Sequence, residues 1–148
     1  MAQVKRKRKV RVQTYAKLKK RLDAVFSLWT RVRFGLAFCH RIGEVRCVSC
    51  DVRKPVAEMQ AGHFVSRSYL ATRWHPENVA PQCVQCNIFK KGNLAAFAAW
   101  GVDRYGMDWP ARMVSLSRVP TKFSRSDLEI LIAEYEEKLK VLTGNSQQ

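Results

Sequence analysis

Four cysteines in two Cys-x-x-Cys pairs constrain this chain more than any other feature. The pairs are Cys47–Cys50 and Cys83–Cys86. Two thiolates from each of two tight turns supply the closed tetrahedral site that structural zinc prefers. The pairs are separated by 32 residues, more than the usual gap of roughly 15–20 in a simple zinc ribbon, so we expect further structure between them. Two disulfides are the alternative, although intracellular thiols are normally kept reduced.

The charge of the chain predicts a polyanionic partner. Its 148 residues carry 27 Lys and Arg against 12 Asp and Glu, a net charge of +15, and nucleic acid is the first candidate. The excess is concentrated in residues 1–46, which hold 14 basic and 2 acidic residues. We expect the tip, residues 1–12, to be a disordered segment that binds phosphate backbone. Its candidate contacts are Lys5, Arg6, Lys7, Arg8, Lys9 and Arg11.

Apolar residues are too dispersed for a membrane-spanning protein. The longest apolar run, Leu94 to Val102, is far shorter than the roughly 20 residues needed to cross a bilayer. No apolar segment follows the basic tip, which excludes a signal peptide. The 47% hydrophobic fraction is enough for one modest core, and a zinc ion would stabilise the part least able to bury apolar surface.

Residues 13–38 are predicted to form a basic amphipathic helical arm. Apolar residues recur three and four positions apart from Tyr15 to Leu36, the pattern of a helix that packs against another helix. This seam packs either on the rest of the chain or against a second copy, so a homodimer through this helix is one expectation. Lys19 and Lys20 are candidate contacts to DNA phosphates.

Residues 107–148 are predicted to be a C-terminal helical segment. A short helix follows Asp108, and the last helix begins at the N-cap Ser124, where Asp127 completes a capping box, and ends at Gly144. The predicted buried stripe of the last helix is Leu128, Leu131, Ile132, Tyr135, Leu139 and Leu142. Two exposed ion pairs are expected at helical spacing, Glu134 with Lys138 and Glu136 with Lys140.

Residues 39–106 are predicted to form a small zinc-bound α+β core. A short hairpin is expected at the first cysteine turn, and Met59–Val65 is expected to be a strand that presents His63. Residues 66–82 have the punctuation of a loop. Asn87, directly after the second cysteine pair, is expected to open a helical stretch.

Three polar residues of this core are candidates for phosphodiester hydrolysis. Imidazole titrates near neutral pH, so His63, which a four-cysteine zinc site does not need, can take a proton from water. A cation beside the scissile phosphate is also needed, and the side-chain oxygen of Asn87 can bind a hard ion such as Mg²⁺. Asn78 can fix the intervening loop by hydrogen bonds to backbone. Taken singly, each has a structural alternative, as a core histidine or as a loop or capping asparagine.

These residues resemble a known nuclease family. The order Cys-x-x-Cys, Gly-His, Asn, Cys-x-x-Cys-Asn resembles the four-cysteine H-N-H endonucleases of treble-clef, or ββα-metal, fold, with His63, Asn78 and Asn87 at the H, N and final ligand positions. Longer segments are similar to the NinG (Rap) recombination proteins of lambdoid phages. These segments are Cys47–Cys50, Ala61–Phe64, Glu77–Val79, Gln82–Asn87, Lys91–Leu94 and Ala133–Lys140.

The resemblance implies a structure-specific DNA endonuclease that acts on branched recombination intermediates, such as Holliday junctions and D-loops, in the cytoplasm of the host cell. It implies structural Zn²⁺ together with a catalytic Mg²⁺ or Mn²⁺ at Asn87 and His63. The implied zinc ligands are Cys47, Cys50, Cys83 and Cys86. The phosphate contacts expected in the core are Lys90, Lys91, Arg67 and Arg73.

One position departs from the family pattern. Many H-N-H nucleases carry an acidic residue or a histidine directly before the base, where it binds the catalytic metal, and this chain has Gly62 there. The ion would then depend on Asn87, the substrate phosphate and water. The alternative function is a non-catalytic, zinc-containing DNA-binding accessory protein of recombination. An RNA-binding zinc protein is a third possibility, but it leaves His63 without a role.

Overall fold

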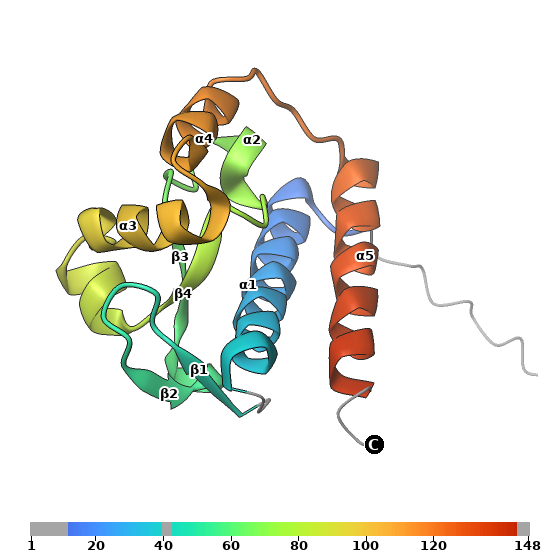
Figure 1. Cartoon of the computed structure of the whole chain (residues 1–148). Helices are drawn as coiled ribbons and strands as arrows, with labels where there is room; N and C mark the ends of the chain where they lie inside the picture. The colour runs from blue at the N-terminus through green and yellow to red at the C-terminus, as the bar shows by residue number, and fades with distance from the viewer. Residues whose placement is uncertain (1–11, 40–42, 145–148) are drawn as a thin grey trace, which may run out of the picture.

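The computed structural model describes residues 12–39 and 43–144 (Figure 1). The basic tip, with its six candidate phosphate contacts at residues 5–9 and 11, lies outside the described residues. Within the described part of the chain, no helix is long and apolar enough to cross a membrane.

The chain has a mixed α/β fold in which helices surround two small antiparallel sheets (Figure 1). The strands are β1 (Glu44–Arg46) paired with β2 (Arg53–Pro55), and β3 (Gln60–His63) paired with β4 (Val79–Gln82). The helices are α1 (Tyr15–Cys39), α2 (Leu70–Arg73), α3 (Leu94–Tyr105), α4 (Trp109–Ser117) and α5 (Arg125–Gly144). Two short helical turns are η1 (Val56–Glu58) and η2 (Gln85–Phe89).

The long helices α1 and α5 lie side by side and enclose one of two hydrophobic cores (Figure 1). We call this the helical core: Leu18, Leu22, Phe26, Trp29, Trp74, Val79, Leu128, Ile132 and Tyr135. Four residues of the apolar seam predicted for the first helix are buried within the chain, as its docking alternative expects, whereas Tyr15 at the start of the helix is exposed. The buried ones are Leu18, Leu22, Trp29 and Val32. The predicted start of α5 is confirmed, since Ser124 N–H donates to Asp127 Oδ2 at 2.7 Å and Asp127 N–H donates to Ser124 Oγ at 3.1 Å.

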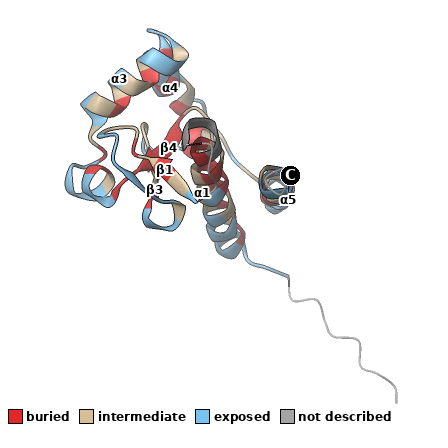
Figure 2. Ribbon diagram, turned by 60° about the horizontal axis from the view of Figure 1, so that its bottom comes forward, coloured by how far each residue is buried: buried red, intermediate tan, exposed pale blue. Residues whose placement is uncertain are grey.

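The second core lies between the cysteine turns and the helices α3 and α4. We call it the cysteine core: Phe34, Val45, Cys47, Met59, Ala80, Cys83, Cys86, Phe97, Trp109 and Met113. Figure 2 shows buried residues gathered where the strands, α1 and α3 face one another. The helices α3 and α4 pack closely because Gly101 lacks a side chain. A Cβ there would lie 2.0 Å from the Trp109 ring.

Three local predictions were wrong. Residues 66–82 are not all loop, because Val79–Gln82 forms β4, whose four residues are buried against β3 and its surroundings. The helical turn η2 begins at Gln85 and not at Asn87. The expected pair of Glu136 with Lys140 is absent, since Glu136 pairs with Arg21 of α1 at 2.6 Å and Lys140 with Glu137 at 3.4 Å. For β4 and for Glu136, a partner that sequence spacing does not specify decided the outcome.

Candidate metal centre and active-site cleft

The four cysteines meet at a single point. Their Sγ atoms all lie within 4.8 Å of one another, and Cys50 Sγ is 3.7 Å from Cys83 Sγ. Zinc–sulfur bonds of about 2.3 Å in a tetrahedron place sulfur pairs about 3.8 Å apart, whereas a disulfide needs about 2.05 Å. The four thiols are free. The cluster can therefore hold a metal such as zinc, and the disulfide alternative is not supported.

A bound cation would change the protonation state of the buried cysteines. Burial raises the pKa of the Cys47 and Cys86 thiols, so without a cation these side chains stay protonated at neutral pH. A bound Zn²⁺ stabilises the thiolate form instead, which makes metal binding part of the folding free energy.

His63 makes a hydrogen bond to the backbone carbonyl of Arg73. At the end of β3, its Nε2 lies 2.9 Å from the carbonyl oxygen of Arg73. A carbonyl oxygen only accepts, so the neutral ring carries its proton on Nε2 and leaves Nδ1 as the acceptor. Burial lowers the pKa of His63 and outweighs the carbonyl of Arg73, which raises it. The imidazole is therefore neutral at pH 7, as a general base must be.

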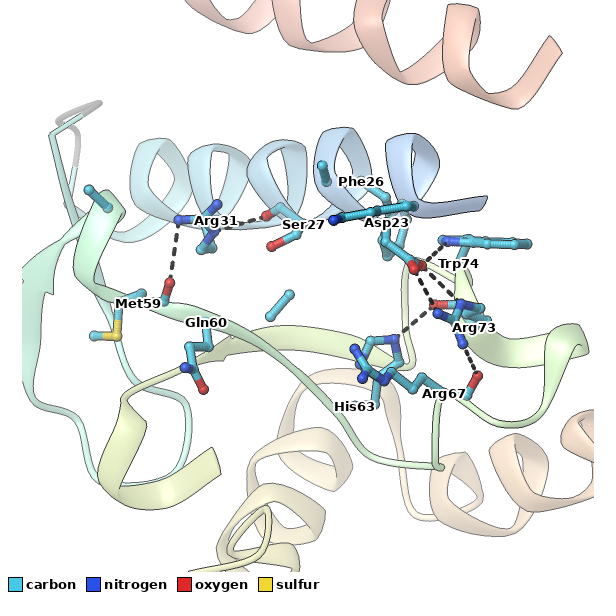
Figure 3. A pocket seen from close by; sticks show the side chains of 14 residues that line it. Asp23, Phe26, Ser27, Arg31, Met59, Gln60, His63, Arg67, Arg73 and Trp74 are labelled. Atoms are coloured by element: carbon cyan, nitrogen blue, oxygen red, sulfur yellow. Dashed lines mark hydrogen bonds and ion pairs between the residues drawn. The ribbon is translucent and has the colours of Figure 1, made fainter. Parts of the chain in front are cut away.

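The residue that holds His63 is itself anchored on α1 (Figure 3). Arg73 donates from Nε and Nη2 to the two carboxylate oxygens of Asp23, at 2.9 and 2.6 Å. Trp74 Nε1 donates to the same carboxylate at 2.9 Å. Arg73 Nη1 donates to the carbonyl of Arg67 at 2.6 Å. A bidentate pair of this kind fixes geometry as well as charge.

This arrangement corrects the expectation for Arg73. Arg73 is 9% exposed, and its guanidinium donates hydrogen bonds to the Asp23 carboxylate and to a backbone carbonyl. The side chain thus has an internal structural role in place of the expected phosphate contact. The sequence signal was faint but present, since Asp23 is the sole carboxylate among six basic residues of α1.

Asn78 joins the two ends of the connection between β3 and β4. It is fully buried, its Oδ1 accepts from the Val65 N–H at 2.8 Å, and its Nδ2 donates to the Val65 carbonyl at 2.9 Å and to the Thr72 carbonyl at 3.0 Å. The Thr72 contact fixes the end of α2, where Arg73 follows. This geometry is the one expected of a residue that keeps His63 in place through the loop.

Asn87 faces the same cleft as His63. Its Nδ2 donates to Gln60 Oε1 at 2.6 Å, and within the described part of the chain its Oδ1 has no hydrogen-bond partner. The amide oxygen is thus the atom available to an ion. We call the shared cavity, of about 540 Å³, the His63–Asn87 cleft. It is lined by Gln60, Ala61, His63, Arg67, Asn87, Ile88, Lys91 and Gly92.

The expected phosphate contacts of the described residues are distributed around this cleft. Arg67 and Lys91 line it, and both are exposed. Lys90 is exposed on the adjoining turn, and Lys20 lines a neighbouring cavity that shares His63 and Arg67. Lys19 lies on α1 outside both cavities and is partly buried.

The position before His63 is closed to any side chain. A Cβ on Gly62 would lie 2.1 Å from Gln82 Oε1 and 2.7 Å from Gln82 Cδ. Gln82 is fully buried, and its Nε2 donates to Ser49 Oγ and to the Gly92 carbonyl, both at 2.7 Å. It therefore ties β4 to both cysteine turns. Among the described residues, no Asp or Glu lines the His63–Asn87 cleft.

Sequence reasoning missed three residues of this region. Asp23 anchors Arg73, Gln60 orients Asn87, and Gln82 occupies the space next to Gly62. Gln60 lies in the strand predicted to carry His63, which was a usable signal. No sequence pattern points to Gln82, because the residues that it contacts are distant in sequence.

The comparisons with known proteins agree with the recombination-protein resemblance. The family model described as Bacteriophage Lambda NinG protein matches residues 2–145. Over 106 residues the chain is 28% identical to Protein ninG of Salmonella phage P22 and 26% identical to Protein ninG of Escherichia phage lambda. Each alignment covers 71% of this chain and 51% of the relative, so the chain spans about half the length of these curated relatives. No solved structure matches the chain. Because the family match covers nearly the whole sequence, the chain belongs to the NinG family of lambda-type bacteriophage proteins.

Proposed function

We propose that this chain is a metal-dependent endonuclease of the H-N-H type that cuts branched DNA intermediates of phage recombination. The observation that supports this most is that His63 and Asn87 line one cleft, with the imidazole fixed in a single tautomer by the Arg73 carbonyl. In this proposal the cysteine cluster, β3, β4 and η2 form a treble-clef, ββα-metal arrangement.

His63 acts as the general base. Its Nδ1 takes a proton from water, the water oxygen bonds to the phosphorus, and the bond from phosphorus to the leaving sugar oxygen breaks. The lowered pKa of His63 keeps the base neutral to a lower pH than an ordinary histidine. The rate should be level from neutral pH down to about 6.5, the ordinary histidine value, and fall only at lower pH.

Asn87 is the residue that would hold the catalytic cation. Its Oδ1 is a hard ligand that suits Mg²⁺ or Mn²⁺, and the hydrogen bond from Nδ2 to Gln60 keeps the oxygen side of the amide free. A bound divalent ion supplies charge stabilisation for the leaving oxygen. Without a carboxylate in the cleft, phosphate and water must supply the other ligands, so ion binding should depend on DNA. The resemblance also names His63 as a ligand of the catalytic ion. In this proposal His63 does not bind the ion, because it accepts the proton of the attacking water.

Branched DNA suits the charge of this surface. Arg67 and Lys91 at the cleft, with Lys90 beside it, offer phosphate contacts that carry little sequence information. A branch is recognised by the placement of its phosphates and by its shape. Symmetric resolution of a four-way junction needs two cuts, which a homodimer would supply. Light scattering with and without junction DNA tests for that dimer.

Cleavage of a synthetic four-way junction with Mg²⁺ tests the nuclease. Replacing His63 by Ala should lower the rate by about 10²–10⁴-fold, the usual contribution of a general base. The matched control is His75→Ala, which removes a histidine outside the cleft and should keep the rate within about threefold. Undiminished cleavage by pure His63→Ala protein would reject the role of His63.

A non-catalytic DNA-binding accessory protein is the second candidate. It is favoured by the closed position at Gly62 and by the lack of a carboxylate among the residues that line the cleft. Tight junction binding without any cleavage by the parent chain, in Mg²⁺ and in Mn²⁺, would select this function.

A further inference from the structure

Next to the His63–Asn87 cleft, the turn after the second cysteine pair exposes apolar side chains that no core uses. Phe89 is 71% exposed and Ile88 is 55% exposed. Neither belongs to the helical core or the cysteine core, and Phe89 makes no ring contact with any described residue. Val84 and Leu94, at the two ends of the same segment, are 40% and 50% exposed.

This segment is held firmly from beneath. Cys86 is buried in the cysteine core, and the Gly92 N–H donates to the carbonyls of Cys86 and Asn87 at 3.0 Å. The Lys90 N–H donates to the Gln85 carbonyl at 2.9 Å. Gln82 Nε2 donates to the Gly92 carbonyl. The exposed side chains of Phe89 and Ile88 therefore lie on an ordered turn, and their position relative to the cleft is fixed.

The surroundings of Phe89 are positively charged. Lys90 and Lys91 follow it directly and are exposed, and the sequence from Cys83 to Val102 contains no Asp or Glu. Ile88 and Lys91 also line the cleft that holds His63 and Asn87. An apolar aromatic surface bordered by cations suits a partner that has both flat apolar faces and negative charge. Unstacked nucleobases on a phosphate backbone have this combination.

We propose that Phe89, supported by Ile88, is a stacking surface for an unstacked base of the DNA, next to the phosphate that enters the His63–Asn87 cleft. Aromatic rings stack on any base, and apolar side chains of DNA-bending proteins insert between base steps that are easily opened. Bases at a branch point are already partly unstacked, so the ring meets them at a lower cost than in a continuous duplex. Phe89 thereby prefers branched to fully paired DNA, independently of base sequence.

This inference rests on the proposed function for the identity of the polyanion, and its test therefore measures binding and not cleavage. The whole 148-residue chain is titrated, in Ca²⁺ at fixed salt, against a four-way junction and against a linear duplex. The two DNAs have the same sequences and number of nucleotides. The junction carries 2-aminopurine at the branch, whose fluorescence changes when a ring stacks on it. The variants are Phe89→Ala and Phe89→Trp, with Ile130→Ala of α5, 65% exposed, as the control.

Phe89→Ala should weaken junction binding about tenfold, within the range for loss of one base–aromatic stack, and change duplex binding less than twofold. Phe89→Trp should restore the preference and the 2-aminopurine signal, and Ile130→Ala should resemble the parent. Because Phe89 is exposed, thermal melting of Phe89→Ala should match the parent and exclude misfolding. The proposal is overturned if Phe89→Ala binds the junction and the duplex with the parent's affinities. It is also overturned if Phe89→Ala loses the same factor of affinity for both DNAs.

The stacking proposal and the nuclease proposal fail separately. A parent chain that prefers junctions through Phe89 but never cuts them rejects the nuclease and keeps the stacking surface. A parent that cuts junctions while Phe89→Ala binds and discriminates as well as the parent keeps the nuclease and rejects the stacking surface.

Discussion

His63 and Asn87, which line the same cleft, are held by different parts of the molecule. Asn87 follows a cysteine ligand directly, so its place depends on the cysteine core. His63 is held through Arg73, which is anchored on Asp23 of α1, beside the helical core. His63 and Asn87 can therefore be disturbed one at a time, and the difference separates support by the cysteine cluster from long-range support by the helices.

The two supports also differ in kind. The cysteine support consists of two tight turns with two cysteines each, and a single metal ion can bind all four thiolates. The helical support is a chain of side-chain contacts that joins residues 50 positions apart in sequence and depends on the correct packing of α1. Changes on the cysteine side should act on metal content and folding, and changes on the helical side should act on the base and its pH dependence.

Loss of the metal has the largest expected effect. Structural zinc contributes on the order of 10–16 kcal/mol in small zinc-binding peptides, so chelation or Cys83→Ser should unfold the cysteine core and displace Asn87. The four tryptophans divide between the cores, with Trp100 and Trp109 on the cysteine side and Trp29 and Trp74 on the helical side. Fluorescence of chains in which one pair is replaced by Phe reports each core separately.

The cysteine-side pair should change first as the chelator is added. Cys39→Ser, at the fifth cysteine of the sequence, is the control and should retain one zinc per chain. If both tryptophan pairs respond together at one chelator concentration, the two supports are a single unit and the comparison fails.

Gly62→Asp is the next largest change. It introduces an acidic side chain directly before His63, but its Cβ would overlap the buried Gln82. We expect a loss of about 3 kcal/mol of unfolding free energy from overpacking, measured by urea denaturation, without tighter Mg²⁺ binding. The double variant Gly62→Asp with Gln82→Ala should recover part of the loss. A stable single variant with raised metal affinity would show that the position is open.

Asp23→Asn tests the helical support. Breaking a buried ion pair costs about 3–5 kcal/mol, and we expect about 2 kcal/mol here because the Asp23 side chain is 33% exposed. Zinc content should not change. Cleavage should fall about tenfold, as expected when a base loses its fixed position. The matched control is Glu136→Gln, which breaks the exposed pair with Arg21 between α1 and α5 and should cost under about 1 kcal/mol.

The pH dependence of Asp23→Asn gives the sharper result. Burial lowers the pKa of His63 in the parent, so its activity is lost only as the pH falls below the ordinary histidine value. A loosened α2 exposes the ring to water, and this relief of burial, the larger effect, outweighs the loss of the Arg73 carbonyl, which by itself would lower the pKa. The pKa therefore rises toward about 6.5, and the acidic limb moves to higher pH. An unchanged pH profile would mean that Asp23 supports the fold but not the base.

Gln60→Met has the smallest expected effect and acts on the cysteine side of the cleft. It removes the acceptor of the Asn87 Nδ2 hydrogen bond, so the amide can rotate and its oxygen faces the ion less often. The Mg²⁺ concentration for half-maximal cleavage should rise about threefold to tenfold, equal to about 0.7–1.4 kcal/mol, the net value of one hydrogen bond. Gln60→Glu keeps an acceptor and should stay at or below the parent value. A parent-like Gln60→Met would remove Gln60 from the site.

Elements with strong local signals were predictable. The apolar periodicity of α1 and the reciprocal Ser124 and Asp127 hydrogen bonds at the start of α5 appear where the sequence places them. The strand that carries His63 was expected over Met59–Val65 and spans Gln60–His63. β4 was missed because Pro81 and its short length resemble a loop, and its pairing comes from β3.

Of the candidate site, spacing alone specified the four cysteines, because two residues between thiols define a turn whatever surrounds it. The residue types of His63, Asn78 and Asn87 were also visible in the sequence. Their chemical state was not: the tautomer and lowered pKa of His63, the free oxygen of Asn87 and the withdrawal of Arg73 from solvent depend on Asp23, Gln60 and buried surroundings far away in the chain. Hydrogen bonds and burial act through space, so only the packed structure could assign them.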